Sequence, residues 1–243
     1  MNPPSQQRVV VVTKVGSWVG AETAVALLRH DVTVIGLGTN AARIDTLHQA
    51  LHRQLPPAQA ARFRPLVGRL TDRTFQDTVA ELINQQGTLT ALVNNAGAYE
   101  DHDGSIAGSS TFDQWDALQR SLVDPLLLFH RIRHVLQRNK CVVVNVASDD
   151  VHSALPRHVS LVAIKTAVNL ITAEIALVVP QVIAVAVHPA APATRLPPEE
   201  RPPQHPNTPL AADLIVDLAL NADRAATGQY YMYTEPEFLT HQE

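Results

Sequence analysis

The chain has 243 residues, 46% of them hydrophobic, and a formal net charge of −4. This length and apolar content suffice for one sizeable core. No basic run is present, so neither nucleic acid nor an anionic membrane is an expected partner. The only cysteine, Cys141, excludes a disulfide framework and favours a reducing, cytoplasmic compartment. Residues 1–8 hold no apolar signal core, and no apolar run reaches transmembrane length.

Short valine-rich runs alternate with helical stretches through the first half of the chain. Runs of this length are typical of buried strands, and the stretches between them indicate helices that join parallel strands. The expected strands lie at Arg8–Thr13 and within Asp31–Asn40, Ala61–Asp72 and Thr88–Ala98. The expected helices lie at Gly20–His30, at Ala41–Leu55 before two prolines, and at Thr74–Gln86 before Gly87.

The alternation resumes after a polar loop that begins at Tyr99. His102 and its acidic neighbours there have spacings that can bind metal, but a solvated acidic loop is the favoured interpretation, so no metal site is predicted. One long helix is expected next, with a kink at Pro125. The expected elements are the helix Thr111–Arg138, a strand at 141–146, the helix His158–Val179, a strand within Gln181–Thr194, the helix Leu210–Leu220 and the strand Gly228–Tyr233.

These elements predict an α/β fold, a doubly wound, Rossmann-like three-layer sandwich with a parallel sheet of about seven strands. We expect residues 1–243 to form a single domain, with 1–7 as an N-terminal tail. The helix His158–Val179 is apolar on more faces than one sheet can cover. A homo-oligomer, either a dimer or a tetramer, is therefore expected.

The stretch Cys141–Ala167 holds most of the candidate chemistry. Ser148 comes just past the end of a buried strand, where open α/β sheets place their ligand sites, and Lys165 lies in the helix that follows. This arrangement resembles the short-chain dehydrogenase/reductase family. In that family a catalytic Ser ends the strand, a Tyr follows thirteen residues later, and a Lys follows four after the Tyr. Here Leu161 takes the Tyr position, and leucine can neither donate nor accept a proton.

The resemblance extends from Arg8 to Tyr233. The family's turn T-G-x-x-x-G-x-G lets the backbone approach the cofactor's pyrophosphate. The family's NNAG motif, which follows the fourth strand, is intact here at residues 94–97. The resemblance also implies a substrate lid at the proline-dense residues 195–209. Vestigial cofactor-binding residues are expected at Thr13, Gly20, Asn94, Ala96, Gly97 and Thr194, with further matches at Asn95, Pro189 and Thr227.

Several positions depart from the family pattern, and they cluster around the expected cofactor. Lys14 and Trp18 take the first two glycine positions, where the indole of Trp18 occupies space that a phosphate needs. Arg69 replaces an Asp that contacts the adenine. Leu122, or Ser121 in a shifted alignment, replaces a helix Asn that holds a water near the Lys. No cofactor-selecting charge follows the second strand.

Three functions are consistent with this pattern. The first is an enzyme that needs no nicotinamide cofactor and acts on a small carbonyl-containing metabolite by isomerisation, elimination or cyclisation. Ser148 would donate a hydrogen bond to the carbonyl, and Lys165, with its pKa lowered by burial, would act as a base or an amine nucleophile. Further acids and bases are available at His152, His158, Tyr99 and His188.

The second function is an atypical oxidoreductase that binds NADP or NAD weakly and uses Tyr99 or His152 as its proton donor. The third is a non-catalytic subunit that supports an active paralogue, since members of the family assemble through their long helices.

Overall fold

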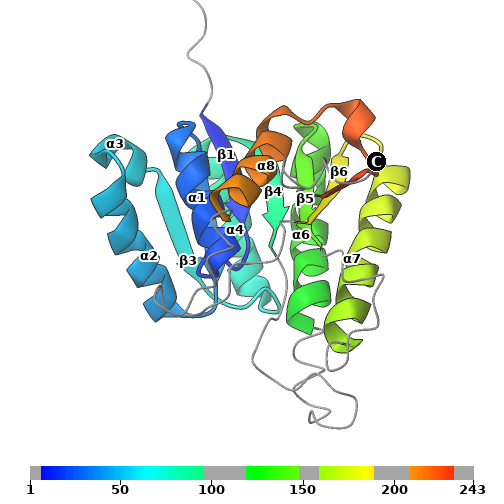
Figure 1. Cartoon of the computed structure of the whole chain (residues 1–243), viewed down its shortest axis with the longest axis horizontal. Helices are drawn as coiled ribbons and strands as arrows, with labels where there is room; N and C mark the ends of the chain where they lie inside the picture. The colour runs from blue at the N-terminus through cyan, green and yellow to red at the C-terminus, as the bar shows by residue number, and fades with distance from the viewer. Residues whose placement is uncertain (1–6, 96–118, 148–158, 189–207, 233–243) are drawn as a thin grey trace, which may run out of the picture.

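The computed structural model describes residues 7–95, 119–147, 159–188 and 208–232 (Figure 1). They form one seven-stranded sheet in the order β3-β2-β1-β4-β5-β6-β7, with every pair of neighbours parallel. The strands are β1 (Arg8–Val12), β2 (Thr33–Gly38), β3 (Phe63–Val67), β4 (Thr88–Asn94), β5 (Val142–Val146), β6 (Ile183–His188) and β7 (Tyr230–Met232). The expected doubly wound sheet is confirmed.

Helices cover both faces of the sheet. They are α1 (Trp18–Arg29), α2 (Ala41–Gln54), α3 (Pro57–Ala60), α4 (Arg73–Gln86), α6 (Asp124–Arg138), α7 (Val159–Val178) and α8 (Thr208–Asn221), with a π-turn η1 (Gln119–Val123) and a 3-10 turn η4 (Arg224–Ala226). Side chains of α1, α2 and α8 pack on one face, and those of α4, α6 and α7 pack on the other.

Successive strand residues point to opposite faces, so each central strand contributes to both cores. In β1, Val10 and Val12 join the core under α1 and α8, while Val9 and Val11 join the core under α4 and α6; all four are completely buried. Strands that are buried on both faces read as continuous apolar runs. This is why the valine runs of the sequence indicate the sheet correctly.

Some element boundaries differ from the sequence-based expectation. Helix α1 begins at Trp18 instead of Gly20, because the hydroxyl of Ser17 caps it by accepting the backbone N–H of Gly20 at 3.3 Å. Helix α8 begins at Thr208 instead of Leu210. The short helix α3 and the turn η4 were not expected. Pro57 is the first residue of α3, a position at which proline costs no hydrogen bond.

The helix that carries Pro125 contains a π-helical segment, which was not expected from the sequence. Among the described residues, η1 continues directly into α6 at Asp124, and the backbone of Val123 between them is helical, with φ −74° and ψ −45°. Proline and π-helical segments are both causes of helix kinks, and the expected kink at Pro125 stays a prediction. The residues before Gln119 lie outside the described part of the chain, so the start of the expected long helix is untested.

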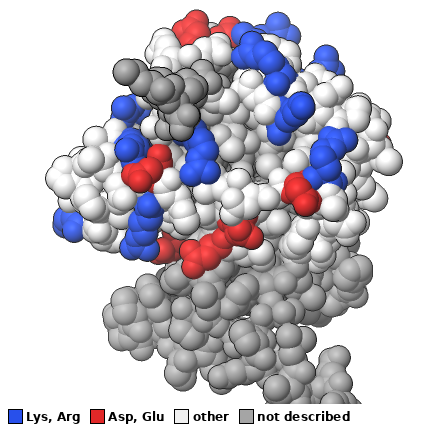
Figure 2. Space-filling view, turned by 90° about the horizontal axis from the view of Figure 1, so that it is seen from above, with Lys and Arg blue, Asp and Glu red and all other residues white. Residues whose placement is uncertain are grey.

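Positive and negative side chains are interspersed on the face of the molecule seen from above (Figure 2). Within the described residues, no helix combines the length and the apolar character needed to cross a membrane.

Candidate functional site

All strands are parallel, so their carboxyl ends meet along one edge of the sheet, the lower edge in Figure 1. Ligands of open α/β sheets bind at this edge. Lys165, the turn after β1, and the ends of β4 and β5 are brought together there. Ser148, His152, His158, Tyr99, Ala96, Gly97 and Thr194 lie outside the described residues, so their predicted roles stay predictions. His188, the last residue of β6, is buried at the same edge.

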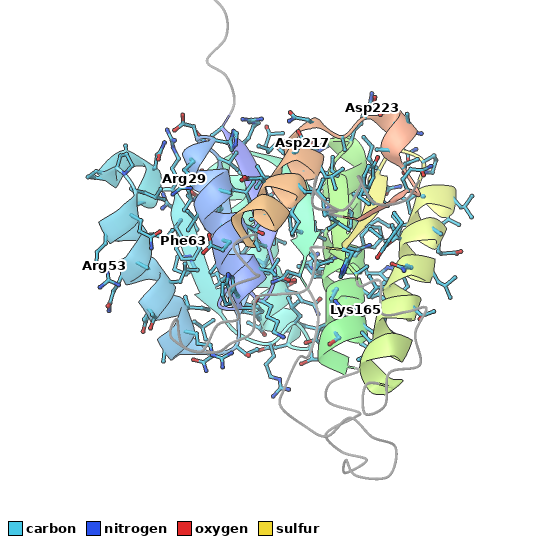
Figure 3. The ribbon with its side chains drawn as sticks, in the orientation of Figure 1. Arg29, Arg53, Phe63, Lys165, Asp217 and Asp223 are labelled. Carbon is cyan, nitrogen blue, oxygen red and sulfur yellow. The ribbon has the colours of Figure 1, made fainter. Side chains whose placement is uncertain are left out.

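Lys165 is the buried cation of the site (Figure 3). It lies in α7, one turn after Leu161, and only 7% of it is exposed. Its Nζ donates a hydrogen bond to the carbonyl oxygen of Val146, the last residue of β5, at 2.8 Å. Desolvation, and to a smaller extent the positive charge of Lys14, together lower the pKa of Lys165 from 10.5 to about 7. The amine therefore loses its proton far more readily than an exposed lysine does.

The turn between β1 and α1 is held together by side chains that the sequence motif anticipates. The Thr13 hydroxyl accepts the backbone N–H of Asn95 at 3.0 Å. The Asn95 amide donates to the Ser17 hydroxyl at 2.8 Å and to the Lys14 carbonyl at 3.4 Å. A Cβ on Gly20 would lie 2.6 Å from that Lys14 oxygen and 2.8 Å from the Asn95 amide nitrogen. Gly20 is thus required by packing, whether or not a cofactor binds.

Lys14 departs from the glycine pattern in side chain but not in backbone. Its φ is 50°, in the left-handed region that glycine enters freely and other residues enter at a cost of roughly 1–2 kcal/mol. The backbone N–H of Ser17 bonds to the Lys14 carbonyl at 3.0 Å, which closes the turn in this conformation. The turn therefore keeps a glycine-like backbone and adds a second cationic side chain, that of Lys14, close enough to Lys165 to affect its pKa.

The residues of this turn do not form a glycine cradle for a pyrophosphate. Such a group needs bare amide N–H groups at a helix N-terminus, with no side chain in front of them. Trp18, half-buried, is the first residue of α1, and the N–H of Gly20 is already bonded to Ser17. Lys14 and Trp18 place side chains at two positions where close backbone approach requires glycine. The turn therefore departs from the glycine pattern that accepts a pyrophosphate.

The ends of β4 and β5 are joined by two asparagines. The Asn94 amide donates to Asn145 Oδ1 at 2.8 Å, and the Asn145 amide donates to the Thr172 hydroxyl at 2.8 Å. This network ties the sheet to α7. The role of Asn145 and Thr172 was missed from the sequence, although a polar residue inside the run CVVVNV is the signal that such a network exists.

A cavity of about 20 Å³ lies beside this network, with room for about one water molecule. Ser121 and Leu122, the two candidates for the family's helix Asn, both line it. Asn94 also lines it, and among the described residues its buried Oδ1 has no hydrogen-bond donor. The π-turn η1 shapes this wall, as π-turns commonly do at functional sites. Asn94 Oδ1 can accept a hydrogen bond from a water molecule in this cavity, beside the residues that replace the family's helix Asn.

Thiol chemistry is not available at this edge. Cys141 is buried before β5, and its Sγ donates to the Leu89 carbonyl at 3.1 Å. Burial raises the pKa of the Cys141 thiol to about 12, so it is protonated at neutral pH. Within the described residues, no group of three or more His, Cys, Asp or Glu side chains is placed to hold a metal ion.

Residues 8–204 match the short chain dehydrogenase family. The chain belongs to this family. Short chain dehydrogenases usually bind NAD(P), so the substituted turn is a departure within the family and not evidence for another fold. No curated protein sequence matches the chain.

Solved structures share the fold at low sequence identity. The KRED1-Pglu enzyme superposes with a TM-score of 0.76 at 17% identity, covering 92% of this chain and 100% of that one. A putative short chain dehydrogenase from Escherichia coli CFT073 has a TM-score of 0.77 at 18% identity, covering 93% and 95%. The YIR035C short chain dehydrogenase/reductase from Saccharomyces cerevisiae has a TM-score of 0.73 at 19% identity, covering 97% and 100%. Identities this low establish the shared fold alone.

Proposed function

We propose that this protein is an enzyme that uses Lys165 as a base or amine nucleophile on a small carbonyl compound, without a nicotinamide cofactor. The observation that carries the proposal is the buried amine of Lys165, whose pKa is lowered to about 7. Tuning a lysine by burial and by a neighbouring cation is a general way to make its amine reactive at neutral pH. Lys165 lies at the carboxyl end of the sheet, where the fold binds its ligands.

The chemistry follows from the neutral form of the amine. An N–H of Lys165 donates to the Val146 carbonyl and holds the amine at the end of β5. In the neutral amine, the nitrogen lone pair is the group that takes up a proton or attacks a carbonyl carbon. As a base, Lys165 removes a proton from the carbon next to a carbonyl, and Ser148 donates a hydrogen bond to the oxygen where negative charge develops. Return of the proton to another carbon gives isomerisation, and loss of a leaving group gives elimination. His152, His158 and Tyr99 are candidates for the second proton transfer.

The proposal predicts hydrogen exchange that depends on Lys165 and not on a cofactor. In deuterium oxide, without NAD(P)H, we expect the protein to exchange the α-protons of at least one member of a panel of ketones and oxo acids, followed by proton NMR. The rate should rise through pH 7 as Lys165 loses its proton. Lys165→Met should abolish the exchange, whereas Lys140→Met, a change at an exposed lysine, should leave it intact. Exchange that persists in Lys165→Met would contradict the assignment.

Weak or absent dinucleotide binding is the second expectation. Calorimetric titration of the wild-type chain with NAD⁺, NADH, NADP⁺ and NADPH should give no dissociation constant in the micromolar range or tighter. The double variant Lys14→Gly with Trp18→Gly restores both glycine positions and should bind at least one of the four more tightly. A micromolar constant for the wild-type chain would overturn this expectation, and so would equal binding by the two proteins.

An atypical NAD(P)H-dependent oxidoreductase is the second candidate function. Membership of the short chain dehydrogenases favours it, together with the glycine-like backbone that Lys14 preserves in the turn. This function requires a proton donor such as Tyr99 or His152, because Leu161 has no proton to donate. The titration with the four dinucleotides separates this candidate from the first, because only an oxidoreductase needs a bound nicotinamide cofactor.

A further inference from the structure

Helix α2 carries two histidines whose rings face each other. His48 and His52 are one helical turn apart, a spacing that places side chains on the same face. Their Nε2 atoms are 3.3 Å apart, and their ring centroids are 5.0 Å apart with the planes tilted by 45°. His52 is exposed, so the point between the two nitrogens is open to solvent.

The separation of the two nitrogens matches the bite of a metal chelate. Zinc binds histidine nitrogen at about 2.0–2.1 Å, and two such bonds at a tetrahedral angle place the nitrogens about 3.3 Å apart. The His48 ring is also held in place, because it packs against the ring of Phe63 in β3 with centroids 5.8 Å apart. One of the two ligands is therefore oriented before any ion arrives.

We propose that His48 and His52 form a two-nitrogen site for a divalent transition-metal ion of the zinc type, with water in the remaining coordination positions. Imidazole nitrogen suits Zn²⁺, Ni²⁺ and Cu²⁺ and does not suit Mg²⁺ or Ca²⁺, which prefer oxygen. Without metal, one ring donates its Nε2 hydrogen to the other. The ion takes the place of that hydrogen, and each ring then carries its hydrogen on Nδ1.

The chain contains a second pair at the same spacing, which serves as an internal comparison. His130 and His134 are one turn apart on α6, and both are exposed. In the described structure the His130 ring lies edge-on to Phe129, with centroids 6.4 Å apart, and makes no ring contact with His134. Spacing alone therefore does not make a site, and the facing nitrogens distinguish the pair on α2.

This inference is independent of the proposed function. Helix α2 and strand β3 lie at the far edge of the sheet from α7. Figure 3 labels Phe63 and Arg53 at that edge, well away from Lys165. Binding of metal at α2 therefore leaves the candidate site untouched, and failure of either proposal has no bearing on the other.

Calorimetric titration of the full chain with zinc chloride at pH 7.5 tests the site. We expect His52→Ala to remove the binding of one zinc ion per chain, or to weaken it at least tenfold, because one imidazole without its partner is a poor ligand. The double variant His130→Ala with His134→Ala should bind as the wild-type chain does, and magnesium chloride should produce no binding at the pair. Zinc binding should also weaken at pH 5.5, since imidazole must be neutral to bind metal.

Identical zinc binding by the wild-type chain and His52→Ala would overturn the proposal, and so would loss of the same ion in the α6 double variant. Thermal melting gives a second readout. Zinc should raise the melting temperature of the wild-type chain and of the α6 double variant, and this rise should be smaller in His52→Ala. His52 is exposed, so its replacement is not expected to prevent folding.

Discussion

The substitution Lys165→Met is expected to stabilise the protein at pH 6 and to lose this advantage as the pH rises toward 10. The pKa of Lys165 is about 7 in the folded chain against an ordinary value of 10.5. Between these two values the unfolded chain binds more protons than the folded chain, so the free energy of unfolding of the wild type increases with pH. Below pH 7 the full cost of burying the charge is present.

The size of the effect follows from the same two values. The difference between about 7 and 10.5 corresponds to about 5 kcal/mol, since one pKa unit is about 1.4 kcal/mol. Replacing Lys165 also leaves the Val146 carbonyl without its donor, which costs about 1–3 kcal/mol at every pH. We therefore expect a net stabilisation of roughly 2–4 kcal/mol at pH 6. It should become a destabilisation near pH 10.

Urea denaturation of the two proteins at pH 6, 8 and 10 measures this difference. Other groups titrate over the same range, but they contribute to both proteins and cancel in the comparison. Lys140→Met is the matched control, because Lys140 is exposed and its replacement should change the free energy of unfolding little at any pH. A wild-type minus Lys165→Met difference that does not vary with pH would show that the amine is not tuned by burial.

The strands of the sheet can be predicted from the sequence for a physical reason, whereas the π-helical segment before α6 cannot. A parallel strand buried on both faces reads as a short apolar run, as β1 does from Val9 to Val12. The π-turn η1 leaves no such sign, because apolar residues continue at helical spacing from Trp115 through Leu128. Pro125 indicates an irregularity in this helix, but proline alone does not specify a π-helical segment before it.

The candidate site divides in the same way. The position of Lys165 is predictable because its spacing from the end of β5 matches that of the family to which the chain belongs. Asn145 is not predictable as a network residue, because its partners Asn94 and Thr172 are 51 and 27 residues away in sequence. Lys14 is recognisable as a departure from a glycine pattern. The left-handed backbone of Lys14 cannot be predicted from the residue type, because the hydrogen bond that closes the turn accompanies this conformation.

The double substitution Leu170→Glu with Leu177→Glu is expected to halve the mass of an oligomer of this chain. The oligomer itself is a proposal, which rests on the apolar side chains that α7 leaves uncovered. Leu170 is 68% exposed, Leu177 is 78% exposed and Val178 is 61% exposed. Two leucines seven residues apart lie on one side of a helix, so the three form an apolar stripe, which the exposed Glu174 interrupts. Burying each leucine against a second copy contributes about 1.5–3 kcal/mol, and a two-fold axis would pair the stripe with itself.

Light scattering at micromolar concentration checks this expectation. The wild-type chain should give the mass of a dimer or tetramer, and the double variant should give half of that mass, which for a dimer is the 26.4 kDa of one chain. Two buried carboxylates facing their own copies across the axis would lack any compensating charge, so the interface should not form. Val67→Glu is the control, because Val67 is an apolar side chain, 49% exposed, at the end of the edge strand β3 and far from α7. It should keep the wild-type mass. A wild-type mass of 26.4 kDa would mean that the stripe on α7 is not an interface between copies of this chain.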